Sequence, residues 1–177
     1  LLVVSCAASL ACLAFSQTAR AVSPPPDGGY FNQNTAEGDF ALNDLDTNNS
    51  SDNTAIGFDA MSTAGIATAN TAVGSQAMEL GAGNFNVGIG ASALFEASGN
   101  NNTGVGSFAL GIVISGNNNT AVGEGAVGNN VSGNDNTGVG FNALGSSTGS
   151  SNIALGKSAG TNLTAGNNNI DIGNAGM

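Results

Sequence analysis

The sequence predicts an all-β protein, a parallel β-roll or β-solenoid in which short strands stack along one axis. Three observations support this prediction. A nine-residue pattern that begins with Asn occurs nine times at nearly constant spacing along the 177 residues. Inside each copy, large apolar or β-branched residues alternate with small ones, which is typical of a strand. No apolar stripe with a 3.6-residue period is visible, and the spacing is too short for two helices and a turn.

The copies follow one another at steps of 19, 17, 16, 16, 17, 17, 16 and 17 residues, and variable loops rich in Gly, Ser and Asn absorb the differences. The copies begin at Asn34, Asn53, Asn70, Asn86, Asn102, Asn119, Asn136, Asn152 and Asn169. Positions within a repeat are counted from this Asn as the first. About nine rungs spaced roughly 4.8 Å apart predict a rod about 40 Å long.

The second and fourth positions predict one face of a strand, because alternate side chains point the same way. We interpret the apolar fourth position as the structural core of the repeats. Its residues are Ile56, Val73, Ile89, Val105, Val122, Val139, Leu155 and Ile172. The third position is Ala or Gly, except at Asp171, and the eighth is also small. We expect neighbouring chains to approach closely at these small positions, and a second short strand to begin at the apolar ninth position.

The fifth position is Gly in all nine copies, which indicates a positive φ or a lack of space for a Cβ atom. The predicted turn glycines after the first copy are Gly57, Gly74, Gly90, Gly106, Gly123, Gly140, Gly156 and Gly173. The Asn residues that begin the second to ninth copies, Asn53 to Asn169, are predicted to turn the chain. We also expect them to form a hydrogen-bonded ladder from rung to rung.

Residues 1–21 predict a signal peptide that is incomplete at its N-terminus. An apolar run is followed by Ala19-Arg20-Ala21, which has the small-x-small form of a cleavage site. A lipoprotein signal acylated at Cys12 is the alternative. The expected location is therefore secreted, at the cell surface or outside the cell.

Behind this segment we predict a linker at residues 22–33 and the repeats at 34–177, with atypical first (34–52) and last (169–177) copies. Both cysteines of the chain, Cys6 and Cys12, fall inside the predicted signal peptide. A mature chain would therefore contain no disulfide.

The charge balance is strongly acidic, with 12 acidic residues, two basic residues and a net charge of −10. Such a chain is expected to bind neither nucleic acid nor an anionic membrane, and no membrane insertion of the mature segment is predicted. The chain has no His, so the commonest catalytic base is missing. We therefore expect no enzyme activity, no cofactor and no metal. Lys157 is interpreted as a solvated lysine, and the spacing of Asp44, Asp46 and Asp52 matches no calcium loop.

Each rung supplies only two or three sizeable apolar side chains, so the core of a single rod is thin. Oligomerisation is a common remedy for a small core, and we expect a homo-oligomer on this ground.

The stretches "NTAIGFDAM", "GNFNVGIGASAL" and "GNNNTAVGEGA" resemble the head repeats of trimeric autotransporter adhesins of the YadA type. The resemblance covers residues 34–177, and similar repeats occur in tail-fibre-like surface proteins. It implies a left-handed parallel β-roll, a homotrimer and a surface-exposed fibre that binds a host or cell-surface ligand. The Asn-Thr-Ala-Val-Gly pattern is one residue shorter than the Asn-Ser-Val-Ala-Ile-Gly pattern of the collagen-binding adhesins, so the resemblance does not extend to collagen binding.

Three functions are compatible with these features. The first is an exported structural and adhesive fibre module for cell-cell or cell-matrix attachment. The second is the subunit of an extracellular filament assembled by end-to-end stacking. The third is an ice- or crystal-binding solenoid, because Thr recurs at the second position, although Val87, Ile153 and Ile170 interrupt this column.

Overall fold

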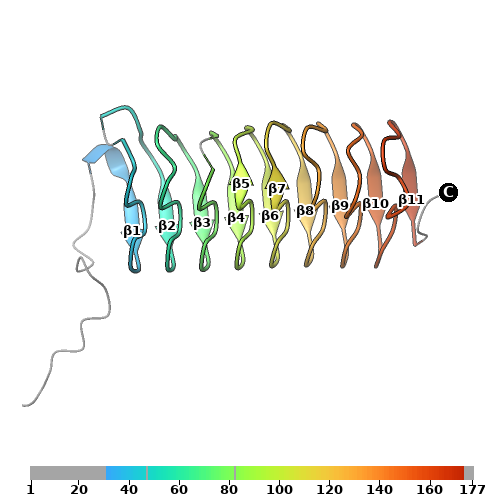
Figure 1. Ribbon diagram of the computed structural model, residues 1–177, viewed down its shortest axis with the longest axis horizontal. Coiled ribbons are helices and arrows are strands. Elements are labelled where there is room, and N and C mark those ends of the chain that lie inside the picture. Colours follow the sequence, from blue (N-terminus) through green and yellow to red (C-terminus); the bar gives the residue numbers. More distant parts are fainter. Residues whose placement is uncertain (1–30, 47, 82, 174–177) are drawn as a thin grey trace, which may run out of the picture.

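The computed structural model describes residues 31–46, 48–81 and 83–173. These residues form a β-solenoid whose main sheet contains nine parallel strands in sequence order. The strands are β1 (Thr35–Glu37), β2 (Thr54–Ile56), β3 (Thr71–Val73), β4 (Val87–Ile89), β6 (Thr103–Val105), β8 (Thr120–Val122), β9 (Thr137–Val139), β10 (Ile153–Leu155) and β11 (Ile170–Ile172). Figure 1 shows them side by side along the long axis of the rod. The prediction of an all-β parallel solenoid is confirmed.

Equivalent positions of neighbouring rungs pair with each other throughout the main sheet. Thr54 pairs with Thr71 and Ile56 with Val73, and this register continues from β1 to β11. The side chains therefore stand in columns that run along the rod. The only helical element of the described residues is a single 3-10 turn, η1 (Phe31–Gln33).

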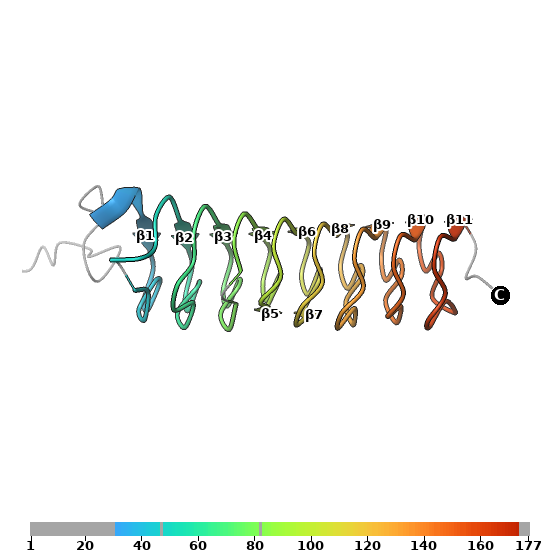
Figure 2. The same ribbon diagram turned by 90° about the horizontal axis from the view of Figure 1, so that it is seen from above.

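The opposite side of each rung differs from the expected second strand. Two short strands, β5 (Glu96–Ala97) and β7 (Ile112–Val113), pair there across the rod from the main sheet (Figure 2). In the other described rungs this side consists mainly of turns. The ninth residue has a positive φ in rungs with and without these strands, as in Met61 at 50° and Leu110 at 54°. The turns still join the rungs, since the Leu110 N–H donates to the Ala126 carbonyl at 3.0 Å.

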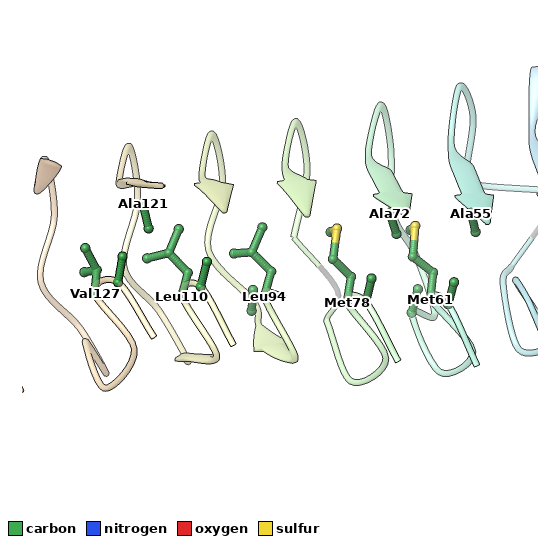
Figure 3. Packing of buried hydrophobic residues seen from close by; sticks show 14 of the residues in the cluster. Ala55, Met61, Ala72, Met78, Leu94, Leu110, Ala121 and Val127 are labelled. Atoms are coloured by element: carbon green, nitrogen blue, oxygen red, sulfur yellow. The ribbon is translucent and has the colours of Figure 1, made fainter. Parts of the chain in front are cut away.

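The interior is built from the third, eighth and ninth positions. Ala55, Ala60 and Met61 of one rung are all fully buried, and this arrangement recurs along the rod. Figure 3 shows the ninth-position side chains Met61, Met78, Leu94, Leu110 and Val127 in one row beneath the third-position alanines. The small third-position residues therefore allow the ninth-position side chains of the same chain to pack closely against the sheet. A Cβ on Gly88 would meet the Met78 Cγ at 3.1 Å, so this glycine leaves room for the core.

The interpretation of the fourth position as core is wrong. All eight residues are partly or largely exposed, because the second and fourth positions face outward when the third faces inward. They are Ile56, Val73, Ile89, Val105, Val122, Val139, Leu155 and Ile172. Likewise, the small third and eighth positions are buried within one chain and cannot be the surface where another chain approaches.

The fifth-position glycines adopt positive φ, with values from 119° to 139° between Gly38 and Gly156 and 68° at Gly173. Gly106 shows why no other residue fits. Its φ is 133°, and a Cβ atom would lie 2.6 Å from the carbonyl carbon of Gly123 in the next rung. The glycine column therefore lets successive turns stack backbone on backbone.

Asn side chains at the first position connect every rung to the next. The Oδ1 atom of each accepts the backbone N–H of the following first-position Asn, at 2.8–3.0 Å from Asn34 to Asn169. From Asn53 to Asn152, the amide group also donates to a carbonyl of the next rung at 2.7–2.9 Å. Asn34 to Asn152 are fully buried, so the amides satisfy backbone groups that water cannot reach.

A second polar column runs two residues earlier and has the opposite polarity. The backbone N–H of Asn100 donates to the side chain of Asn117 in the next rung at 2.8 Å, and Asn117 donates in the same way to Asn134. In "GNNNT", Asn117 therefore belongs to this second ladder and Asn119 to the first. The middle one, Asn118, is exposed and has a φ of 58°.

The predicted signal peptide at 1–21 lies outside the described residues. The same is true of most of the predicted linker, 22–33, and of residues 174–177 in the last repeat.

Candidate functional site

The outer face of the main sheet is a regular surface that runs along the rod. We define it as the side chains at the second and fourth positions of the nine strands. Most fourth-position residues are about two-fifths exposed, from 37% at Val139 to 41% at Ile56, and Ile172 reaches 66%. Because the strands are in register, these side chains form a continuous apolar column. Such a long contiguous apolar strip is typical of an interaction surface.

The second column of the outer face changes along the rod. It carries Thr in six strands, Val87 in β4, and then Ile153 and Ile170 in the last two strands. Thr120 and its equivalents are only half-buried, so their methyl and hydroxyl groups reach the surface. The outer face therefore becomes more apolar toward β11.

An aromatic corner follows the turn glycines, at the sixth and seventh positions. Its residues are Phe40, Phe58, Phe108 and Phe141, all exposed. The rings of Phe40 and Phe58 meet edge to face, with centroids 6.0 Å apart and an interplanar angle of 84°. The Nζ atom of Lys157 lies 5.7 Å from the centroid of the Phe141 ring, within the range of a cation–π contact. These rings add apolar contact area beside the outer face.

An axial groove of about 330 Å³ includes Phe108 of this corner in its lining. Gly111, Gly128 and Gly145, at the tenth position of three successive rungs, also line it. The other lining residues are Phe95, Glu96, Ile112, Gly125, Asn129 and Asn142. The three tenth-position glycines carry no side chain that could fill the groove.

The acidic residues form no metal site among the described residues, where no group of three or more potential metal ligands occurs. Asp46 instead closes a local turn. Its carboxylate accepts hydrogen bonds from the Asn49 side chain at 2.8 Å and the Asn48 N–H at 3.0 Å. These bonds stabilise the charged form and hold the pKa of Asp46 below its usual value of 3.8.

Sequence reasoning located the Asn and Gly columns but not the surface. The eight fourth-position residues come together on the outer face, and Lys157 is exposed beside Phe141. The aromatic corner and the axial groove were not predicted. A signal for the corner was present, because Phe recurs at the two positions after the turn glycine.

None of the described segments is a helix long and apolar enough to cross a bilayer. Comparisons with protein-family models, curated proteins and solved structures find no match.

Proposed function

We propose that this chain is an exported structural and adhesive fibre module, in which rods associate side by side. The assembled rods present a repetitive acidic surface for attachment between cells or between cells and matrix. The observation that carries the proposal is the outer face, an exposed apolar column that runs through the strands from Ile56 to Ile172. A rod of stacked repeats offers an extended surface that is suited to spacing and presentation.

The partner on the outer face is a second copy of the same chain. The columns repeat along the axis, so parallel rods can match rung to rung over their whole length. The nine strands span about 38 Å at 4.8 Å per step, and three residues span about 10 Å, which gives roughly 400 Å². A stable interface needs about 800 Å² per partner, so one pairwise contact between outer faces is too small.

In a homotrimer each rod contacts two neighbours, and the flanks of the outer face then add to the contact area. The flanking aromatic corner, including Phe58 and Phe141, then adds area to the contact. Three rods are also the number that the resemblance to trimeric adhesin heads implies. Exposed carboxylates outside the strands, such as those of Glu124 and Asp135, supply the acidic surface for the cell-surface ligand.

An attachment assay tests this function. Beads coated with the protein are mixed with cells or with matrix-coated surfaces, and bound beads are counted. Wild-type beads should attach, whereas beads coated with Val122→Glu, which places a charge on the outer face, should attach poorly. Val131→Glu is the matched control, because Val131 is equally exposed, at 41% against 40%, but lies in a loop off the outer face. Equal attachment by both variants, or none by the wild type, argues against the proposal.

The Thr column also allows a direct check of the ice-binding alternative. Five Thr residues in the internal strands are in register on the outer face, but only one stands in each rung. Thermal hysteresis by the purified protein would support that function in place of attachment.

A further inference from the structure

Carboxylates occur in the two outermost strands of the main sheet and in none of the seven strands between them. β1 carries Glu37 at the fourth position, where the internal strands have Ile, Val or Leu. β11 carries Asp171 at the third position, where the internal strands have Ala or Gly. Among the described residues, these two strands each have a neighbour on one side only. Open strand edges are templates for pairing with another chain.

Asp171 points inward, into a column that is otherwise apolar. The equivalent residues Ala55, Ala72, Ala121 and Ala154 are fully buried. The Oδ2 atom of Asp171 is buried and has no hydrogen-bond partner among the described residues. A carboxylate in this position is costly to desolvate, so a further rung stacked on β11 would raise the cost.

The core around Asp171 is adapted to this carboxylate. The ninth position is Leu, Met or Val in the preceding rungs, but it is Gly160 beneath β11. A Cβ on Gly160 would lie 2.8 Å from the Leu144 Cδ2 and 3.5 Å from the Asp171 Oδ2. A larger residue at position 160 would therefore fill the space beside the carboxylate. Among the described residues, the apolar ninth column ends at Leu144, and Asp171 occupies the third position of the last described rung.

Glu37 lies in β1, at the opposite edge of the main sheet, and its fourth position faces outward, whereas Asp171 faces inward. If β11 of one copy paired with β1 of another in the register of the internal rungs, Glu37 would stand beside Ile172 and Asp171 beside Ala36. The first would interrupt the apolar column of the outer face. The second would enclose an unpaired carboxylate within the core.

We propose that Glu37 and Asp171 prevent these rods from stacking end to end. Inward-pointing charges and short, charged edge strands are known means of protecting a sheet edge. The two carboxylates limit growth along the axis and leave the sides of the rod free for association. This inference is independent of the proposed attachment function, because it concerns pairing at the two edges of the main sheet and not side-by-side contact between rods.

The test restores the internal pattern at both ends. The variant Glu37→Val, Gly160→Leu, Asp171→Ala should form particles that are multiples of the wild-type length along the axis. Negative-stain electron microscopy measures that length, and sedimentation should show a mass that rises with protein concentration. A second variant, Asp171→Asn with Glu37→Gln, removes both charges with little change in shape and should lengthen the particles less.

The control Glu124→Gln, Asp135→Asn removes two exposed carboxylates away from the edges, and its particles should keep the wild-type length. Circular dichroism shows whether each variant keeps its β structure. The inference is overturned if both edge variants are folded and keep the wild-type length. It is also overturned if the wild type forms long axial filaments, or if the control lengthens as much as the edge variants.

Discussion

The Oδ1 atom of Asn102 accepts a hydrogen bond from the backbone N–H of Asn119 at 2.9 Å, and the same side chain donates to the Gly116 carbonyl at 2.9 Å. One amide thus holds the next rung at two points, and both Asn residues are fully buried. Repetition of this clamp joins rungs that share only three residues of strand. The stability of the rod should therefore depend strongly on these side chains.

Asn102→Ala should lower the free energy of unfolding by roughly 2–5 kcal/mol, because a buried N–H and a buried carbonyl lose their partners. Chemical denaturation followed by circular dichroism measures the loss. Asn118→Ala is the control, since Asn118 is exposed and its side-chain amide donates to the exposed Asp135 carboxylate, at 3.1 Å. Ala69 already occupies the equivalent position with a φ of 56°, so the control should cost less than about 1 kcal/mol. Equal losses in the two variants would refute the clamp.

Gly106→Ala should destabilise the protein by roughly 3 kcal/mol or more, because it combines an unfavourable φ with a backbone collision. The added Cβ would lie 2.6 Å from a carbonyl carbon of the next rung. Gly65→Ala is matched to it, since Gly65 also has a positive φ, at 62°, but has nothing within 4 Å of the added atom. That change should cost only about 1 kcal/mol. Thermal unfolding of both variants separates stacking from backbone preference, and a similar cost for the two would contradict the stacking argument.

Leu144→Ala and Leu155→Ala compare an interior position with the outer face. Leu144 is fully buried at a ninth position, and Leu155 is 39% exposed at a fourth position. The first change should cost roughly 2–5 kcal/mol through the cavity that it leaves. The second should cost about 1 kcal/mol or less when unfolding is measured at a protein concentration too low for association. A larger loss for Leu155→Ala than for Leu144→Ala would show that the fourth position, and not the ninth, belongs to the core.

Asn49→Ala should raise the pKa of Asp46 toward 3.8, because the Asn49 amide is the main group that stabilises the carboxylate. The folded pKa is depressed, so the hydrogen-bonded turn adds stability above pH 3.8, and this contribution is lost as the pH falls through the lower folded pKa. An NMR titration of the Asp46 carboxyl measures the shift. An unchanged pKa in the variant would show that the Asn49 bond has no influence.

The repeat register, the strands and the two roles of the Asn and Gly columns could be predicted from the sequence, because identical residues at equal spacing must stack. The direction of the side chains could not. A short strand with β-branched or apolar residues at positions two and four and a small residue between them gives no sign of which face is inside. The answer depends on the ninth residue: Leu110 has a φ of 54°, unusual for Leu, and this turn brings its side chain under the third position.

The groove could not be predicted for a related reason. Gly111, Gly128 and Gly145 occupy the tenth position of three successive copies, but the pattern does not show whether the neighbouring side chains leave a groove beside them. A linear pattern shows each of them as one more loop glycine. By contrast, the charges at Glu37 and Asp171 are visible in the sequence. A role in edge protection follows only from the structure, which places both strands at the edges of the sheet.

The solution mass of the purified protein tests the central claim, that the outer face joins copies of this chain. Light scattering coupled to size-exclusion chromatography should give three times the mass of the 17.1 kDa chain, corrected for any residues removed by processing. Val122→Glu should reduce the mass to that of one chain, and Val131→Glu should leave it unchanged. A wild-type protein with the mass of a single chain, or a Val122→Glu variant that keeps the mass of the wild type, would contradict the account.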